Sequence, residues 1–367
     1  MNILLAEPFF GGSHAAWARG LQARSRHRIE LLTLPDRSWK WRMHGGALTL
    51  ARQFLASDFR PDLILASDML DLTTFLALTR ERTAGVPTVL YFHENQLAYP
   101  WSPNDPDASN GRDRHYGFIN LASAAAADAV WFNSAHNRDT FLAGCTDLLG
   151  RMRDFRELER VEELAGRAEV MPLGLDLAAL DRHRPERHRD GPPLVLWNHR
   201  WEHDKDPEAF FAALFALAER GVDFEVAVLG QAFRSYPPVF DQARERLGDR
   251  IVRFGFAEDP ADYAAWLWAA DVLPVTSRHD FFGISVVEAA YCATRPLLPD
   301  RLAYPELIPE AWQAACLYGG DDELPGRLEA ALNGAGPDTE SLRTALAEYD
   351  WSRMAPRYDA ALEALAG

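Results

Sequence analysis

The chain has 367 residues, of which 48% are hydrophobic and 25% are charged, a balance typical of soluble globular proteins. This length exceeds what one ordinary hydrophobic core supports, so about two domains are expected. There is no run of about 18 uncharged apolar residues, and the N-terminus is expected to form a strand rather than a signal peptide, so we expect a cytoplasmic protein without a membrane partner.

The acidic charge is unevenly distributed. Taken over the whole chain, the formal net charge of −16 argues against a polyanionic partner. The charge is not the same in the two parts of the chain, however. Residues 1–120 contain 13 Lys and Arg against 12 Asp and Glu, so the acid lies in the remainder. A local basic patch is expected between Arg19 and Arg42. The three cysteines share no close spacing, which predicts neither a disulfide framework nor a zinc cluster.

Short aliphatic runs alternate with segments of helical period through the first half of the chain. The expected strands are 2–6, 28–34, 61–67, 87–93, 129–134 and 168–173. The expected helices between them include 15–23, 47–57, 72–82 and 119–127. This alternation predicts a doubly wound parallel sheet.

The same pattern restarts after a charged, proline-rich stretch at 181–193. Expected strands follow at 194–198, 224–230, 250–256, 271–277, 296–299 and 315–318, with helices such as 208–220 and 261–269 between them. We therefore expect an α/β protein of two Rossmann-like domains. The boundaries are 1–178 for the N-terminal domain, 179–193 for a linker, 194–350 for the C-terminal domain and 351–367 for a last helix that packs back on the first domain.

Two adjacent glycines, Gly11 and Gly12, follow the first expected strand. They permit positive φ and a close approach of the backbone to a ligand. A tight turn without a ligand is the alternative. The dinucleotide pattern Gly-x-Gly-x-x-Gly is absent here, so a nicotinamide cofactor is not supported.

His93 emerges at the carboxyl end of the fourth expected strand, the edge where α/β proteins bind ligands, and Glu94, Asn95 and Gln96 follow it. Polar groups just beyond a buried strand need hydrogen-bond partners, which a polar substrate would supply. A purely structural role of the histidine is the alternative. The next loop, 101–116, is either mobile or a lid over an acceptor.

Arg200 and Lys205 lie five residues apart across the first strand-to-helix turn of the second half. They can converge on one diphosphate, the guanidinium as a fork and the ammonium as a point charge. Surface charges without a ligand are the alternative. The neighbouring His199, His203 and Asp204 lack closing ligands at metal-binding spacing, so no metal site is predicted.

Asp280 and Glu288 lie on either side of an expected helix N-terminus at Gly283, with seven residues between them. Such a terminus presents unpaired backbone N–H groups and a partial positive charge, which suit a diphosphate or the oxygens of a sugar. The alternative is a solvated aspartate and a glutamate that caps the first turn.

Together these motifs resemble those of the tRNA-queuosine α-mannosyltransferases, a branch of the retaining nucleotide-sugar glycosyltransferases with the GT-B fold, in which two Rossmann-like domains face a cleft. The segments that carry the resemblance cover nearly the whole chain: 10–14, 39–43, 92–96, 172–176, 197–205, 279–283 and 304–306. Two positions depart from the wider pattern. Asp280 stands where Glu is usual, and Ala293 stands where Gly is frequent.

The resemblance implies transfer of mannose, with retention, from GDP-mannose to the cyclopentenediol of queuosine in the anticodon of tRNA-Asp, without a metal or other cofactor. It implies that Arg200 and Lys205 stabilise the leaving diphosphate and that Asp280 and His93 orient the sugar. The donor-binding residues that it implies are Gly11, Gly12, Phe281, Phe282, Gly283 and Glu288, the last on the ribose. It does not predict the oligomeric state.

On the acceptor side, aromatic and basic residues interleave at 39–42, as expected where bases stack and phosphates meet cations. The alternative is an amphipathic loop that packs its tryptophans inward. The acceptor candidates are Ser13, His14, Trp39, Lys40, Trp41, Arg42, Glu94, Asn95, Gln96, Arg112 and Arg114.

Two other functions stay open at this point. One is a glycosyltransferase acting on a lipid, glycan or small molecule. The helices of the first half have ordinary mixed faces and not the basic amphipathic face of a membrane helix, which argues against it. The other is a non-catalytic module that binds RNA or a nucleotide sugar, against which the retained Arg200, Lys205, Glu288 and Asp280 weigh.

Overall fold

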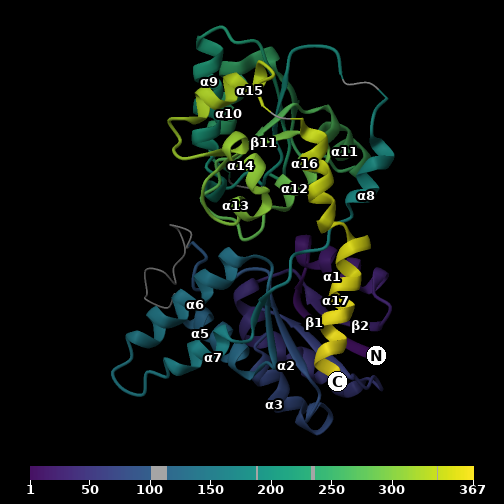
Figure 1. Cartoon of the computed structure of the whole chain (residues 1–367). Helices are drawn as coiled ribbons and strands as arrows, with labels where there is room; N and C mark the ends of the chain where they lie inside the picture. Colours follow the sequence, from purple (N-terminus) through teal and green to yellow (C-terminus); the bar gives the residue numbers. More distant parts are fainter. Residues whose placement is uncertain (101–113, 187–188, 233–235, 337) are drawn as a thin grey trace. The chain divides into compact units, whose positions relative to one another are not determined.

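The computed structural model describes residues 1–100, 114–186, 189–232, 236–336 and 338–367 (Figure 1). The chain divides into two compact units, one formed by Met1–Leu175 with Trp351–Gly367 and one by Asp176–Asp350. The division falls three residues before the expected end of the first domain, and the described part of the expected linker belongs to the second unit. Among the described residues, no helix has both the length and the apolar character needed to cross a bilayer.

The first unit contains a parallel six-stranded sheet in the order β2-β1-β3-β4-β5-β6. Its strands are β1 (Asn2–Phe10), β2 (Arg28–Pro35), β3 (Leu63–Ser67), β4 (Thr88–Phe92), β5 (Ala129–Phe132) and β6 (Ala168–Val170). Its helices are α1 (Gly12–Arg24), α2 (Trp39–Ala56), α3 (Leu72–Thr83), α5 (Arg114–Ala126), α6 (Ala135–Gly150), α7 (Glu159–Ala165) and α17 (Trp351–Ala366). Every residue of β3 and β4 is buried, as expected for central parallel strands with helices on both faces.

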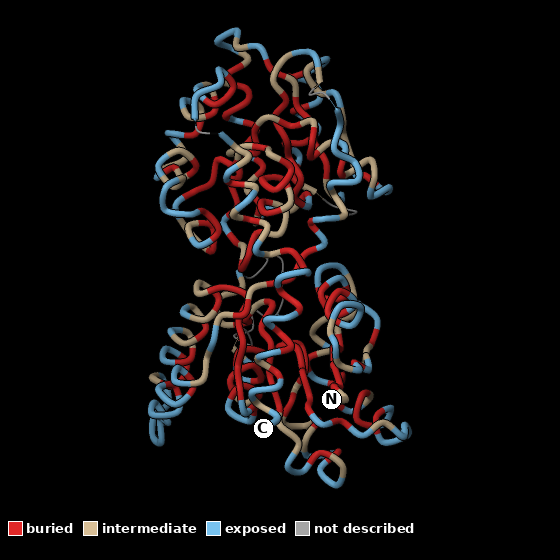
Figure 2. The backbone as a smooth tube through the Cα atoms, turned by 45° about the vertical axis from the view of Figure 1, so that its right-hand side comes forward, coloured by how far each residue is buried: buried red, intermediate tan, exposed pale blue. Residues whose placement is uncertain are grey.

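The second unit contains another parallel six-stranded sheet, in the order β12-β11-β10-β7-β8-β9. Its strands are β7 (Leu194–Trp197), β8 (Glu225–Val228), β9 (Ile251–Phe254), β10 (Val272–Pro274), β11 (Arg295–Pro299) and β12 (Leu317–Tyr318). Its helices are α8 (Leu177–Leu180), α9 (Pro207–Glu219), α10 (Val239–Leu247), α11 (Pro260–Ala269), α12 (Ile284–Tyr291), α13 (Tyr304–Leu307), α14 (Glu310–Cys316), α15 (Leu324–Leu332) and α16 (Thr339–Leu346), with short 3₁₀ turns at Asp181–His183, His203–Lys205, Gly248–Arg250 and Ala347–Tyr349. In both units the buried residues form the interior and the exposed residues lie around the outside (Figure 2).

The last helix, α17, follows the second unit in sequence but belongs to the first. It lies beside α1 (Figure 1). The Tyr358 hydroxyl donates a hydrogen bond to the Pro172 carbonyl at 2.9 Å and accepts one from the Trp17 indole at 3.1 Å. A side chain at Gly20 would collide with the ring of Trp351, so the close approach of α1 and α17 requires glycine there.

Helix α2 starts eight residues earlier than the predicted helix at 47–57. The predicted helix begins just after Gly45 and Gly46, but both glycines are buried within the observed helix. A Cβ at Gly45 would lie 2.5 Å from the Trp41 ring, and one at Gly46 would lie 3.0 Å from Pro8. The glycines therefore leave room for Trp41 and Pro8 rather than forming a turn.

Candidate active site

In each unit the sheet grows first in one direction from its first strand and then in the other, so a switch point lies between β1 and β3 and another between β7 and β10. Open α/β sheets bind ligands beyond the carboxyl ends of the strands at such points. The loops after these strands carry Gly11 and Gly12 in the first unit and Arg200, Lys205 and Asp280 in the second. The topology therefore brings together, within each unit, residues far apart in sequence.

Lys205 lies at the centre of the second-unit cluster. Its ammonium group donates a hydrogen bond to the His279 carbonyl at 2.7 Å and lies 3.3 Å from the Asp204 carboxylate and 3.5 Å from that of Asp280. The side chain is only 10% exposed. A buried ammonium is tolerated only with such partners, so the local fold holds a positive charge at this sheet edge.

Asp280 is held from three sides. Besides Lys205, its carboxylate accepts hydrogen bonds from the Phe282 backbone N–H and the Tyr304 hydroxyl, each at 3.2 Å. Burial works to raise the pKa of Asp280, but the positive charge of Lys205, with a smaller effect of His199, holds it below its usual range. Asp280 is therefore a carboxylate at neutral pH.

Helix α12 begins after Gly283, where the sequence predicted a turn into a helix N-terminus. Gly283 is the N-cap of the helix and has a φ of +100°. An added Cβ would lie 2.9 Å from Leu307 and 3.2 Å from Tyr304. Phe281 and Phe282 are buried, so these two residues can offer a donor only their backbone. The N–H of Phe282 already binds Asp280, and donor binding by these groups stays a prediction.

Glu288 is partly buried on α12 and accepts a 2.8 Å hydrogen bond from the Tyr263 hydroxyl of α11. Burial raises the pKa of Glu288 to about 7, although the bond from Tyr263 opposes the change. The side-chain amide of Asn198 lies 3.4 Å from the same hydroxyl and donates to the Ser285 carbonyl at 2.9 Å. The predicted ribose-binding acid therefore titrates near neutral pH.

Arg200 is the exposed cation of this cluster. Half of its side chain is accessible, and its guanidinium lies 3.1 Å from the Glu202 carboxylate. The adjacent His199 is buried. The pKa of His199 is lowered to about 4, mainly by burial. The positive charges of Lys205 and Arg200 also lower it, whereas the negative charges of Asp280 and Asp204 raise it. His199 is thus neutral, and its Nδ1 lies 3.0 Å from the Ser285 hydroxyl.

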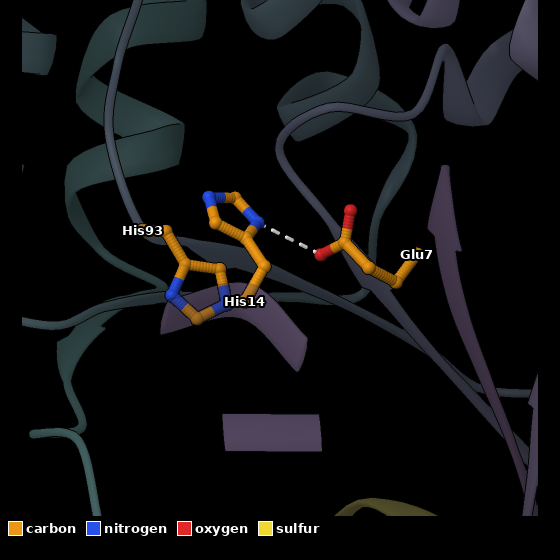
Figure 3. A group of neighbouring side chains, drawn as sticks. All are labelled: Glu7, His14 and His93. Atoms are coloured by element: carbon orange, nitrogen blue, oxygen red, sulfur yellow. Dashed lines mark hydrogen bonds and ion pairs between the residues drawn. The ribbon is translucent and has the colours of Figure 1, made fainter. Parts of the chain in front are cut away.

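In the first unit, His93 belongs to a buried cluster with His14 and Glu7 (Figure 3). His14 Nδ1 lies 2.9 Å from Glu7 Oε2, and the rings of His14 and His93 are 4.2 Å apart. Asp68, which follows β3, accepts the backbone N–H of His93 at 2.8 Å. Burial raises the pKa of Asp68 well above its ordinary value.

Glu7, His14 and His93 also have ligand atoms within 4.8 Å of one another, the one such group of three found among the described residues. The direct bond between Glu7 and His14 accounts for their proximity without an ion. The absence of a metal cofactor stays a prediction.

The polar residues after His93 mostly bind the protein itself. Asn95 is fully buried, and its amide donates to Asn137 at 2.8 Å. The Gln96 backbone N–H donates to Asn120 at 3.0 Å, and its side chain donates to Glu94 at 2.8 Å. These contacts hold the loop in shape, and they assign Asn95 a structural role in place of the predicted acceptor contact.

The two tryptophans at the start of α2 point in different directions. Trp39 packs against the cluster of Met43, Met69, Tyr116 and Ile119, whereas Trp41 is 60% exposed. Lys40 lies over the Trp39 ring at 5.7 Å, and Arg42 donates to the Pro35 carbonyl at 3.0 Å. The inward-packing alternative therefore holds for one tryptophan of the two.

The remaining candidates differ in accessibility. Gly12 has a φ of +49° and open space beside it, whereas a side chain at Gly11 would collide with Asp36. Ser13 is exposed on the first turn of α1. Arg114 begins α5 and lies 3.2 Å from Asp147. Arg112 and most of the expected loop 101–116 lie outside the described residues.

Sequence reasoning gave no role to Glu7, Asp68, Tyr263 or Tyr304, and it considered His199 only as a metal ligand. Asp68 carried a usable signal, because it directly follows a buried strand just as His93 does. Tyr304 begins one of the segments that carry the resemblance, but its contact with Asp280, like that of Tyr263 with Glu288, depends on tertiary packing.

Two family profiles together span most of the chain. Residues 2–175 match the profile described as tRNA-queuosine alpha-mannosyltransferase N-terminal, and residues 180–349 match glycosyl transferases group 1. A Drosophila melanogaster tRNA-queuosine alpha-mannosyltransferase is 34% identical over 84% of this chain and 82% of its own length. A GDP-mannose-dependent alpha-(1-6)-phosphatidylinositol dimannoside mannosyltransferase of Mycobacterium tuberculosis is 28% identical over 84% of this chain and 75% of its own.

Solved structures show the same fold at low identity. Sucrose-phosphate synthase from Thermosynechococcus elongatus has a TM-score of 0.72 and 16% identity, with 100% of this chain and 99% of the other covered. Anabaena HepE in complex with UDP has a TM-score of 0.69 and 17% identity, with both chains covered in full. The expected GT-B fold is confirmed.

Proposed function

Because the chain belongs to the tRNA-queuosine alpha-mannosyltransferase family, we propose that it transfers mannose from GDP-mannose to the cyclopentenediol of queuosine in the anticodon of tRNA-Asp, with retention. The observation that carries this proposal is the 34% identity to the Drosophila relative over 84% of the chain. A likeness that extends through both units supports a shared acceptor as well as shared chemistry. The cytoplasmic location expected from the sequence fits a tRNA acceptor.

The donor is proposed from the relatives and from the site. GDP-mannose is named in the Mycobacterium relative and in a Xanthomonas campestris relative that acts on cellobiosyl-diphosphopolyprenol, 24% identical over 66% of this chain. In the proposed complex Glu288 accepts hydrogen bonds from the ribose hydroxyls. Asp280, anchored by Tyr304 at 3.2 Å, accepts one from the sugar.

The chemical step needs stabilisation of the charge that develops on the departing GDP. Lys205 and Arg200 supply it, the first buried and fixed, the second half exposed and able to close on the phosphate. A preorganised donor aimed at developing charge contributes about 10²–10³-fold to the rate. The diphosphate competes with Asp204 and Asp280 for Lys205. In other sites a metal ion stabilises this developing charge. Here the two side-chain cations do so, and we propose that no metal ion is required.

The acceptor hydroxyl attacks from the face that GDP leaves, and the departing phosphate oxygen takes its proton. On the RNA side, the exposed ring of Trp41 offers a surface for an unpaired base, with Lys40 one residue away on the first turn of the same helix. A protein of net charge −16 with so local a basic surface should bind RNA in a strongly salt-dependent manner.

The test is transfer of label from radioactive GDP-mannose in the presence of EDTA. The acceptors are queuosine-containing tRNA-Asp and the same tRNA with guanosine at that position. Label should enter only the modified tRNA, and Arg200→Ala should reduce the rate at least about 100-fold. Arg246→Ala, which removes an exposed guanidinium of the same unit that pairs with Glu219, should leave the rate unchanged.

Each failure has a distinct meaning. Binding of GDP-mannose without transfer to either tRNA would reject the acceptor and favour a lipid or glycan, as the names of the bacterial relatives suggest. Absence of GDP-mannose binding would reject the donor. Equal losses in the two arginine variants would reject the assignment of Arg200.

A further inference from the structure

A buried group of ionisable side chains at the β1–β3 switch point has more members than the proposed reaction uses. Glu7 comes from β1, His14 from the first turn of α1, Asp68 from the end of β3, and His93 from the end of β4. All four are at least nine-tenths buried. Charged groups are costly at such depth unless they are paired, so their arrangement needs an explanation.

Glu7 is fixed by two contacts. One carboxylate oxygen accepts the backbone N–H of Phe9 at 2.8 Å, and the other faces Nδ1 of His14 at 2.9 Å (Figure 3). Glu7 is completely buried, so water does not compete for these oxygens. The contacts define both the tautomer and the ring orientation of His14: Nδ1 carries a proton that it donates to Glu7.

The surroundings of His14 favour its charged form. Burial lowers the pKa of His14, but Glu7, with smaller contributions from Asp68 and Glu94, raises it to about 9. His14 is therefore an imidazolium throughout the neutral range and loses its proton only as the pH passes about 9. The positive charge lies beside His93, whose ring is 4.2 Å away.

His93 has the opposite character. Burial, aided by the charge on His14, holds the pKa of His93 well below its ordinary value, so this ring is neutral. The rings of Trp17 and Tyr91 pack edge-on against it at 4.7 and 4.9 Å. Its Nε2 is buried and makes no hydrogen bond with the described part of the protein. A buried polar atom without a partner needs an explanation, and a bound substrate hydroxyl would supply one.

We propose that Glu7 and His14 are positioning residues for His93: Glu7 fixes on His14 the proton for which the two histidines compete, and the resulting imidazolium polarises a neutral His93 whose Nε2–H donates a hydrogen bond to a hydroxyl of the substrate. This inference rests on the proposed glycosyl transfer. A neighbouring cation draws electron density from a neutral imidazole, which makes its N–H a stronger hydrogen-bond donor to a hydroxyl oxygen and its free lone pair a weaker acceptor.

Two other roles of the same side chains lead to different observations. A Glu7–His14 dyad that acted as general base would work through the neutral form of His14, so the rate would rise with pH up to about 9. A metal site would need both histidines neutral, and the purified protein would contain the ion. In the proposed role the cation is the active form, so the rate falls as the pH passes about 9.

The first test uses the free protein and does not depend on any substrate. Histidine NMR of ¹⁵N-labelled protein should show the His14 ring protonated up to about pH 9 and a His93 pKa well below that of an ordinary histidine. In Glu7→Gln the pKa of His14 should fall below 6.5, because only burial and the weaker acids remain. In His14→Gln the pKa of His93 should rise. Unchanged titrations in both variants would overturn the proposal.

The second test uses the pH dependence of the turnover number at saturating GDP-mannose and tRNA. The turnover number of the native protein should be nearly constant from about pH 6.5 to 8 and decline with a midpoint near pH 9. In Glu7→Gln the decline should move to lower pH, so that the rate at pH 8 is at least about tenfold below that at pH 6. Glu30→Gln, an exposed acid on the neighbouring strand, should behave like the native protein.

The outcomes separate the possible failures. A uniform loss in Glu7→Gln at every pH would mean a merely structural role and would overturn the proposal. So would a native rate that rises to pH 9, or a stoichiometric metal lost in Glu7→Gln and found by elemental analysis. Histidine titrations as expected without any mannosyl transfer would reject the proposed function and leave the charge assignment intact.

Discussion

Binding of GDP-mannose should become tighter as the pH rises through 7, because the proposed ribose-binding acid titrates there. Burial raises the pKa of Glu288 to about 7, and the ionised carboxylate is the stronger acceptor for hydroxyl groups. A carboxyl group with this pKa is about one-tenth ionised at pH 6 and about nine-tenths ionised at pH 8. If the ionised form alone binds, the Kd should be about tenfold lower at pH 8 than at pH 6.

Isothermal titration calorimetry of GDP-mannose without tRNA measures this directly. The Glu288→Gln variant should bind more weakly at pH 8, and its Kd should not vary over the same range. Glu208→Gln, an exposed acid at the start of α9, is the matched control and should keep the native pH dependence. A native Kd that is constant from pH 6 to 8, or a pH dependence that survives in Glu288→Gln, would refute the reasoning.

Two further predictions concern the buried ion pair and the surface of α2. Lys205→Ala leaves Asp280 buried without its cation, so urea denaturation should show a loss of about 3 kcal/mol in unfolding free energy; unchanged stability would mean that the two groups are not coupled. Trp41→Ala should weaken tRNA binding by about 1–3 kcal/mol in filter binding and leave the Tm unchanged, whereas Trp39→Ala, which opens the Met43 cluster, should lower the Tm. Equal effects of the two tryptophan variants on both quantities would contradict the assignment.

The order of elements could be predicted because strand and helix periods differ and the turn residues mark their ends. The alternation of strand and helix periods was sufficient to predict two parallel sheets. The motifs that follow β1, β7 and β10 lie at the two switch points. The start of α2 could not be predicted in the same way. Paired glycines ordinarily interrupt a helix, and only the contacts with Trp41 and Pro8 explain why Gly45 and Gly46 lie inside one.

The candidate site was only partly predictable for a related reason. A motif identifies a residue, but the partner that sets its charge comes from elsewhere in the chain. Lys205 was expected to meet a diphosphate, and its contact with Asp280, 75 residues later, depends on β7 and β10 lying next to each other. Glu7 followed the expected end of the first strand, whereas the observed β1 continues to Phe10 and carries Glu7 in its buried part. The alternation of apolar and polar residues along a strand does not show which distant residue Lys205 or Glu7 will contact.

The two units use the same electrostatic arrangement at their switch points, although they share no motif. In each, a carboxylate holds a buried cation: Glu7 holds His14, and Asp280 holds Lys205. In each, that cation adjoins a buried histidine, whose pKa it helps to lower. The Nε2 atoms of both histidines, His93 and His199, are buried and make no hydrogen bond within the described residues. A neutral imidazole can donate to or accept from a hydroxyl group without a change of charge. Each of the two rings, kept neutral by burial and by an adjacent cation, therefore keeps one protonation state throughout the neutral pH range.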